Sequence, residues 1–400
     1  MTVKYSPFDV QQTKNPHETL KELRSKCPVS QFMDGFYYLS KHSDITRAFT
    51  DYSTFSSSGG PAQRETQIAK DERTINWYDP PEHTKLRQLL NYSLNAKSYL
   101  QSESFIRKTT QELLNKFAGK DQVNLKEELA RPLPGIIISY IIGIPLEHVD
   151  KFIGWTDTMT AEAAKRGVSP SEIYITGDKI EAARLQREYV QNQIDVRRNS
   201  SNPPDDLITR MIRYRDEEGN SLSNAAILAQ LRFLLFAGHE TTRNLITLLL
   251  YRLIENPKLY ERVRNDRSLV AAAIEETLRI DGPVQLLLRT VVKDVEVSGV
   301  NIPKGSRVIL GLRSGNRDEE AYENADEFNI DRKTSPMHLT LGRGSHYCIG
   351  APLAKLEATV CINELLDRYP KISLAPGYTR KKDDNYSINE LKSLDVVFPE

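Results

Sequence analysis

Apolar residues recur every three to four positions along most of the chain, which is the period of helices packed on a core. The spacing predicts helices over Pro16 to Lys26, Ser43 to Thr50, Ser102 to Phe117, Leu125 to Ile142, Leu146 to Lys165, Ser171 to Arg198, Asn224 to Glu255 and Ser268 to Ile280. Asn224 to Glu255 is the longest, and Pro257 stops it. Its roughly 30 residues would span about 45 Å, enough to cross the whole molecule.

Segments with strand character are short and gather in a few places. Pro28 to Phe32 and Phe36 to Leu39 flank Asp34-Gly35, which is a hairpin signal. Alternating or β-branched segments also follow Leu288, over Thr290 to Val292, Asp294 to Val297, Val300 to Ile302 and Arg307 to Leu310. We expect a last hairpin from Asn385 to Ile388 and Leu394 to Phe398. The pattern therefore predicts a mainly α chain with small β-sheets.

Length and composition bound the class of protein. The chain has 400 residues, beyond the ~250–300 where one hydrophobic core stops growing, so two packed lobes are expected. Lys+Arg and Asp+Glu both number 54, and a balanced charge gives no field that favours nucleic acid or an anionic membrane. The most apolar run, Ile136 to Leu146, is about half the ~20 residues that a membrane helix needs. We therefore expect neither nucleic-acid binding nor a membrane anchor.

Three cysteines, Cys27, Cys348 and Cys361, lack the spacing of a disulfide framework or a zinc site, which suits a reducing cytoplasm. Cys348 stands out, because it ends a glycine-rich loop directly before the apolar segment Ala351 to Leu366. Backbone N–H groups and the dipole at a helix start favour a thiolate, and a thiolate is a good axial ligand for heme iron. The alternative is a small buried hydrophobe, the common fate of a free cysteine.

The middle of the longest helix carries a second unusual stretch, Ala237-Gly238-His239-Glu240-Thr241-Thr242. Glycine, an acid and two threonines are locally unfavourable in a buried helix. Such misfits tend to mark function. The alternative is a chance polar patch on a surface helix, although Leu234, Leu235 and Phe236 beside it argue against much exposure.

Leu341 to Gly350 resembles the cysteine-ligand loop of the cytochrome P-450 family, F-G-x-G-x-H-x-C-x-G, with Leu341 in place of the first residue. That departure bears on redox tuning rather than on ligation. Ala237 to Thr242 is similar to the family pattern [A/G]-G-x-[D/E]-T-T, and Glu276-Thr277-Leu278-Arg279 is similar to its E-x-x-R element. The three motifs follow one another in the order that the family uses, and the resemblance runs over roughly residues 10 to 400.

The resemblance implies a cytochrome P-450 fold, a triangular prism with a large helical lobe and a smaller β-rich lobe. A single domain would cover residues 1–400. Its β-rich lobe would comprise about 16–60 and 285–312 together with the C-terminal hairpin. The cofactor would be heme b, iron protoporphyrin IX, with Cys348 as the axial ligand of the iron.

The resemblance also implies roles for particular residues. Glu240 would feed protons, and the Thr241 hydroxyl could bond back into its own helix and open a groove for O₂ and water. The heme-binding residues would be His83, Arg87, Ala237, Gly238, Arg289, His346, Cys348 and Gly350. The apolar pocket would be lined by Leu234, Ala237, Val284, Leu286 and Leu287. A buried ion pair of Glu276 and Arg279, completed by Arg332, would support the cysteine loop.

Two of these groups have ordinary explanations as well. His83 and Arg87 share one helix face and suit a heme propionate, since an Arg fork and a His donor match a carboxylate. The same pair could be a solvated polar face. Glu276 and Arg279 could be a routine surface pair.

The function implied is a heme-thiolate monooxygenase that inserts one oxygen atom of O₂ into an apolar organic substrate, by hydroxylation or epoxidation. The sequence contains no glycine-rich dinucleotide fingerprint. Electrons would therefore come from a separate ferredoxin or flavodoxin-type donor with its reductase, docking near Arg343, Lys355 and Lys85. A peroxide-driven heme oxygenase and a non-catalytic heme sensor or carrier are the alternatives. The acid–threonine pair argues against both.

Overall fold

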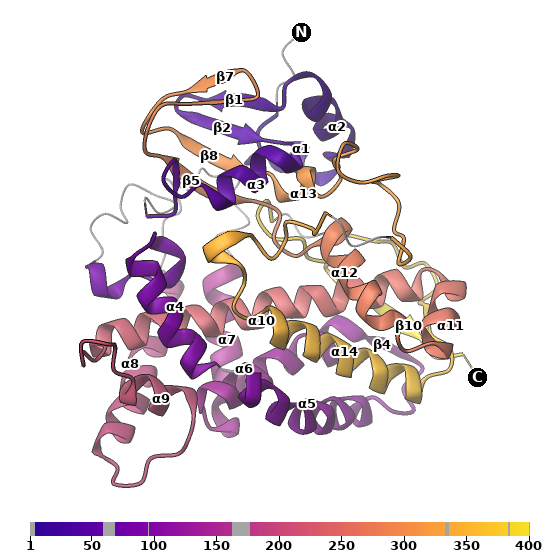
Figure 1. Ribbon diagram of the computed structural model, residues 1–400. Helices are drawn as coiled ribbons and strands as arrows, with labels where there is room; N and C mark the ends of the chain where they lie inside the picture. The colour runs from indigo at the N-terminus through magenta and orange to yellow at the C-terminus, as the bar shows by residue number, and fades with distance from the viewer. Residues whose placement is uncertain are drawn as a thin grey trace.

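The computed structural model describes residues 5–58, 69–94, 96–161, 177–332, 336–382 and 385–399. These residues form a mainly α protein with small β-sheets, which confirms the fold class expected from the periodicity. A β-rich part lies at the top of the view in Figure 1, above a larger helical part crossed by the long helix α10 (Asn224–Ile254). Among the helices of the described ranges, none is long and apolar enough to cross a membrane.

Most helices overlap the predicted spans, although α5 and α6 begin six or seven residues from their predicted starts, and four helices were not predicted. The helices are α1 (Val10–Lys14), α2 (His17–Lys26), α3 (His42–Thr50), α4 (Glu82–Ser93), α5 (Ala96–Lys116), α6 (Pro132–Ile142), α7 (Val149–Ala161), α8 (Gly177–Asn199), α9 (Leu207–Arg213), α10, α11 (Pro257–Asn265), α12 (Leu269–Asp281), α13 (Leu312–Gly315) and α14 (Ala351–Arg368). The unexpected helices are α1, α9, α11 and α13. Pro257 both stops α10 and opens α11, because proline suits the first helical turn.

The largest sheet has five strands in the order β1-β2-β8-β5-β3. They span β1 (Val29–Met33), β2 (Phe36–Leu39), β3 (Phe55–Ser56), β5 (Leu287–Val291) and β8 (Arg307–Leu310). The predicted hairpin joins β1 to β2, and Gly35 supplies the left-handed residue at φ 70°. β5 lies inside the sheet between β8 and β3, which fixes the position of Arg289.

The C-terminal segment differs from the hairpin expected of Asn385 to Ile388 with Leu394 to Phe398. β10 (Asp395–Val397) pairs with β4 (Gln122–Asn124) and β9 (Ser373–Leu374) instead. Ile388 forms a bridge with Val284, and Lys382 forms one with Leu391. The remaining strands, β6 (Val295–Val297) and β7 (Val300–Ile302), form the short hairpin predicted around Ser298-Gly299. The prediction of the last hairpin was wrong because these long-range pairings leave no mark on local alternation.

α10 lies at the centre of the main hydrophobic core and packs against α6, α8, α12 and α14. Its first turn is capped by Ser223, whose hydroxyl accepts from the Ala226 amide at 3.0 Å. Glu240 is only 4% exposed, and His239 and Thr242 are buried beside it. The polar stretch in the middle of α10 is therefore not a patch on a surface helix.

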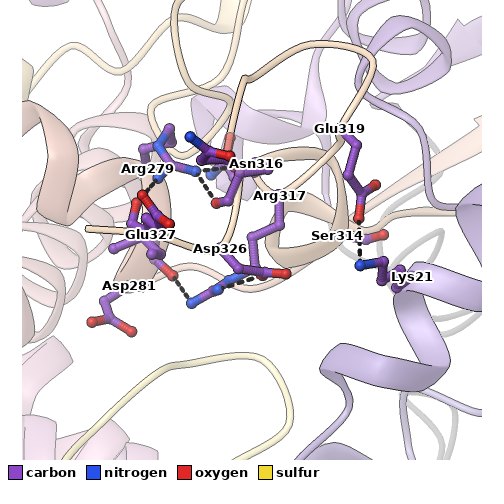
Figure 2. Close-up of polar contacts among 12 residues, drawn as sticks. Lys21, Arg279, Asp281, Ser314, Asn316, Arg317, Glu319, Asp326 and Glu327 are labelled. Carbon is purple, nitrogen blue, oxygen red and sulfur yellow. Dashed lines mark hydrogen bonds and ion pairs between the residues drawn. The ribbon is translucent and has the colours of Figure 1, made fainter. Parts of the chain in front are cut away.

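Arg279 and Glu276, both on α12, form a buried pair at 2.7 Å, and Arg332 reaches the same carboxylate at 3.2 Å. The Arg279 guanidinium also donates to three backbone carbonyls, of Asn316 (2.8 Å), Ala325 (2.7 Å) and Glu327 (2.8 Å). Figure 2 shows the Arg279 side chain directed at Asn316 and Glu327. Glu276 and Arg279 therefore form a buried ion pair and not the routine surface pair that was the alternative.

Hydrogen bonds continue from this ion pair to the cysteine loop. Asn316 accepts from the Leu339 amide at 2.7 Å and donates to the Thr340 hydroxyl at 2.9 Å. Leu341 follows directly and accepts from the Cys348 amide at 2.8 Å. We therefore propose that Glu276, Arg279 and Arg332 hold the loop that carries Cys348.

We predict that Arg279→Ala lowers the free energy of unfolding by about 3–5 kcal/mol, because it leaves Glu276 buried with only one cationic partner. Urea unfolding of the heme-loaded protein, followed by far-UV circular dichroism, measures the change. Arg262→Ala is the matched control, since Arg262 pairs with Asp331 on the surface and such pairs contribute at most about 1 kcal/mol. Equal losses in the two variants would contradict a supporting role for Arg279.

Candidate functional site

The loop from Leu341 to Gly350 is shaped by two glycines with left-handed backbone. Gly342 has φ 72° and Gly344 has φ 60°, values that L side chains rarely adopt. A Cβ on Gly342 would lie 3.2 Å from the His346 carbonyl, and one on Gly344 would lie 3.3 Å from the Phe49 carbonyl. The glycines therefore let the chain fold tightly upon itself and against α3, with Cys348 at the end of the turn.

Two opposing effects act on the Cys348 thiol. Burial raises its pKa above the ordinary value, while the Gly350 and Ala351 amides and the Arg87 guanidinium lower it. The expected N–H donors at the start of α14 are thus present, but burial outweighs them. A bound metal cation would reverse this balance, because a thiol that coordinates a metal is deprotonated.

Four basic side chains from three elements gather beside this loop. His83 and Arg87 come from α4, Arg289 from β5, and His346 from the 3₁₀ turn Gly344–His346. The His83 and His346 rings lie 4.1 Å apart between centroids, and Arg87 donates to the Tyr347 carbonyl at 2.7 Å. The structure thus brings together the residues that the resemblance assigned to the heme propionates.

These groups lack the partners that buried donors normally have. Both ring nitrogens of His83 and Nε2 of His346 are buried without a hydrogen-bond partner. Arg289 is 7% exposed and donates to the Leu288 carbonyl at 2.8 Å. Neither Arg87 nor Arg289 is within ion-pair distance of an acidic side chain in the described ranges.

The pKa values of the same groups reflect this surplus of positive charge. Burial lowers the pKa of Arg289 to about 10, and only Asp79 opposes the shift. Burial, followed by Arg289 and His83, lowers the pKa of His346 to about 3. Burial and then Arg87 lower the pKa of His83. Carboxylates bound here would satisfy the donors and offset the charge, so the residues fit the propionates of a heme whose iron Cys348 would ligate.

A cavity of about 330 Å³ adjoins this cluster, with Arg289 and His346 in its wall. Its apolar lining includes Phe49, Trp77, Leu286 and Leu287. Two residues of the predicted substrate pocket, Leu286 and Leu287, line this cavity, and their contact with a substrate stays a prediction. Phe49 and Trp77 had not been predicted, because an aromatic residue on a short helix or turn looks the same in sequence whether it packs in a core or lines a cavity.

The other predicted pocket residues have different surroundings. Val284 bridges Ile388 and packs on the core of the β-rich part, and Leu234 belongs to the main core around α10. A Cβ on Gly238 would lie 3.1 Å from the Ile138 side chain of α6. Gly238 therefore allows close packing between α10 and α6, a contact that the sequence did not predict. The roles of these residues toward substrate and heme stay predictions.

The acid–threonine pair of α10 belongs to a buried ionic network. The Thr241 hydroxyl donates to the Ala237 carbonyl at 2.7 Å, which is the bond back into the helix that the sequence suggested. Glu240 lies 3.8 Å from Arg243, which also pairs with Glu390 at 2.9 Å. Glu390 in turn pairs with Lys126 at 2.8 Å. The Glu240 carboxylate is thus held from one side by a guanidinium shared with a second acid.

Arg243, Glu390 and Lys126 were not predicted as parts of the site. One signal was available, because Glu240 and Arg243 have the same E-x-x-R spacing as Glu276 and Arg279. Glu390 and Lys126 come from the C-terminal loop and from the π-helical turn Lys126–Ala130, far away in the sequence. No local pattern connects them with α10.

Comparison with known proteins identifies the family of the chain. The family model described as Cytochrome P450 matches residues 3–387. The chain belongs to the cytochrome P450 family. Putative cytochrome P450 YjiB of Bacillus subtilis (strain 168) is 30% identical over 92% of this chain and 91% of its own length. Vitamin D(3) 25-hydroxylase of Pseudonocardia autotrophica is 32% identical over 91% of this chain and 89% of its own length.

The fold comparison gives the same family. The crystal structure of the cytochrome P450 CYP109E1 from Bacillus megaterium, in complex with corticosterone, matches with a TM-score of 0.84. It is 30% identical and covers 97% of this chain and 99% of its own. The cytochrome P450 fold, the monooxygenase class and heme b as the cofactor are thereby confirmed as properties of the family to which the chain belongs.

We predict that Arg289→Met makes the heme-free protein more stable and its heme binding weaker. At neutral pH, below its lowered pKa, Arg289 is a buried cation, and removing it should raise the free energy of unfolding by roughly 1–3 kcal/mol. Heme affinity should fall, because a propionate would lose a charged donor. Urea unfolding and heme titration measure the two effects. Arg47→Met, at an exposed arginine of α3, should change neither, and a destabilised heme-free Arg289→Met would contradict the interpretation.

Proposed function

We propose that the protein is a monooxygenase that inserts one atom of O₂ into an apolar organic molecule by hydroxylation or epoxidation. In this proposal Cys348 would hold the heme iron through its sulfur, and the propionates would be held by His83, Arg87, Arg289 and His346. One observation carries the proposal furthest. Glu240 is buried and Thr241 is half-buried in the middle of α10, while the helix that follows Cys348, α14, packs against α10.

When bound, heme supplies the reductive activation of O₂ and its transfer to carbon. The chain's own contribution is the supply of protons. Because Thr241 donates its hydrogen to the Ala237 carbonyl, its oxygen is oriented to accept a hydrogen bond from water or from a protonated group. Glu240, one residue earlier, is the acid that hands a proton toward this position.

Arg243 positions Glu240 in this scheme. Its guanidinium is shared between the Glu240 and Glu390 carboxylates. It can therefore stay paired with one carboxylate when the other moves or takes up a proton. Glu390 is itself held by Lys126. The network thereby keeps the Glu240 side chain oriented in a region closed to bulk water.

The substrate class follows from the cavity beside Arg289. Phe49, Trp77, Leu286 and Leu287 offer an apolar surface, which suits a substrate held mainly by burial of carbon. A relative whose name is a vitamin D(3) hydroxylase and a similar structure in complex with corticosterone support a rigid, ring-bearing substrate of steroid-like size.

Electrons come, in this proposal, from a ferredoxin or flavodoxin-type donor that docks on the side of the cysteine loop. Two of the three cations expected there are ion-paired, Lys355 with Glu275 at 2.5 Å and Lys85 with Glu218 at 3.7 Å. Arg343 forms no ion pair with an acid of the described residues and contacts the Met337 carbonyl. Arg343 is therefore the cation most available to an acidic donor.

We predict that Cys348→Ser abolishes the red-shifted Soret band of the ferrous carbon monoxide complex, because only a thiolate ligand produces it. Absorption spectra of the reduced protein under carbon monoxide are the measurement. Cys27→Ser, in which a thiol distant in sequence from the loop is changed, should keep the band. A red-shifted band in Cys348→Ser would show that another residue ligates the iron.

We predict that Thr241→Ala releases several-fold more hydrogen peroxide per electron pair and forms correspondingly less product. The reason is the loss of the hydroxyl that receives protons from Glu240. Peroxide and product are measured against NAD(P)H consumed. Thr247→Ala is the control, since Thr247 lies on the same helix and donates to the Arg243 carbonyl at 2.8 Å in the same way. If Thr241→Ala forms as much product per NAD(P)H as the unchanged protein, Thr241 does not receive protons from Glu240.

A further inference from the structure

A second cavity, of about 570 Å³, lies away from the cysteine loop. It is bounded by the turn between α1 and α2, by Arg313 of α13 and by the C-terminal loop around residues 380–392. Glu390 is the one acid among its described lining residues. Six lysine and arginine side chains line it together with His17, and we call it the cationic cavity: Lys14, Arg313, Arg380, Lys381, Lys382 and Lys392.

The acids nearest to the cationic cavity already have partners. Asp281, at the end of α12, is 3% exposed and is bound by Arg252 at 2.6 Å and Arg380 at 3.0 Å. Glu390 pairs with Arg243 and Lys126, as described above. Among the described residues, no acidic side chain lies within ion-pair distance of the remaining five cations of the cavity, which are Lys14, Arg313, Lys381, Lys382 and Lys392.

Each of these positive side chains disfavours the charged form of its neighbours. Burial, followed by Arg313, lowers the pKa of Lys382 to about 7, and Asp281 only partly opposes the shift. Burial, followed by Arg317, Arg313 and Lys382, lowers the pKa of His17 to about 3. Nδ1 of His17 and Nε of Arg380 are buried without a hydrogen-bond partner in the described part of the chain. The cavity therefore holds positive charge, together with buried ring and guanidinium nitrogens that have no partner among the described residues.

The walls of the cavity are fixed by the fold. Arg313 donates to the Thr13 carbonyl at 3.0 Å and to the Gln285 side chain, which ties α13 to the end of α1. Arg380 lies over the Tyr251 ring, 4.7 Å from its centroid. The Lys392 amide donates to the Lys381 carbonyl at 2.9 Å. Arg380 has Asp281 as its partner, while the other five cations stay close with no counterion among the described residues. Such preorganised charge favours binding of an anion.

We propose that the cationic cavity binds a phosphate or diphosphate group, with Lys382 and Arg313 as direct ligands and with Lys14, Lys381 and Lys392 around them. A multiply charged oxyanion offers several acceptor atoms to lysine and arginine donors at once. The volume is larger than a single phosphate needs, so a phosphate carried on a larger molecule also fits. This binding site does not depend on the reaction proposed for the heme site.

The test is calorimetric titration of the heme-loaded, full-length protein with inorganic phosphate, pyrophosphate and glycerol phosphate at low ionic strength. We expect saturable binding of at least one of them. Preference for glycerol phosphate would indicate an organic phosphate, and preference for pyrophosphate a diphosphate. Lys382→Met should weaken binding by about tenfold or more, the loss expected for one charged hydrogen bond.

Lys293→Met removes the same charge from an exposed lysine beyond β5 and should leave binding unchanged. Lys381→Met, at the exposed rim of the cavity, replaces Lys382→Met if that variant folds poorly. We expect Lys381→Met to weaken phosphate binding as well. Lack of saturable binding, or equal weakening by Lys293→Met, would overturn the proposal.

Asp383 and Asp384 lie outside the described residues. Phosphate binding that arises only in a variant with Asp383→Asn and Asp384→Asn would show that the chain's own carboxylates occupy the cavity, which also overturns the proposal.

Discussion

The constraint on which the site depends is the burial of positive charge beside Cys348. Arg87 and Arg289 approach the loop from α4 and β5, and the tilted rings of His83 and His346 lie against each other beside it. In the part of the chain that the structure describes, no acid forms an ion pair with either guanidinium group, and Asp79 only partly offsets the charge of Arg289. A folded protein tolerates such an arrangement where a ligand completes it, and a heme brings two carboxylates and a metal cation together. The propionates would offset the arginines, and the iron would convert the disfavoured thiolate into the favoured form of Cys348.

This arrangement needs a rigid support, because its members come from distant parts of the sequence. α10 provides one side, since it is buried along most of its length and packs against α6, α8, α12 and α14 among other helices. Arg279 provides the other, through its bonds to Glu276 and to three carbonyls of the segment that precedes the cysteine loop. Figure 2 shows how this segment folds around the Arg279 side chain. The polar groups of this support have hydrogen-bond partners within the protein, whereas both ring nitrogens of His83 and Nε2 of His346, beside Cys348, lack such partners among the described residues.

The sequence predicted those parts of the fold and site that depend on local chemistry. The hydrophobic period located most of the helices, and glycine placed the turns of the Cys348 loop. Thr241 bonds back to Ala237 because both positions lie on one helix, four residues apart. Pairings between distant segments were missed. β10 joins β4 and β9 rather than its neighbour in sequence, and Glu390 and Lys126 reach α10 from two other elements. Such contacts depend on tertiary packing, which a single sequence does not record.

Three buried arginines show how the number of partners separates structural from functional roles. Arg279 is bonded to one carboxylate and three carbonyls, so its charge and its donors are fully used within the protein. Arg243 is shared between two carboxylates, of which Glu240 is the weaker contact at 3.8 Å and so the one more readily released. Arg289 has one carbonyl and the face of the Phe49 ring. Residue type and burial are alike in all three. The shortage of acceptors around Arg289 is what points to a ligand, and it identifies the site more directly than the sequence motif does.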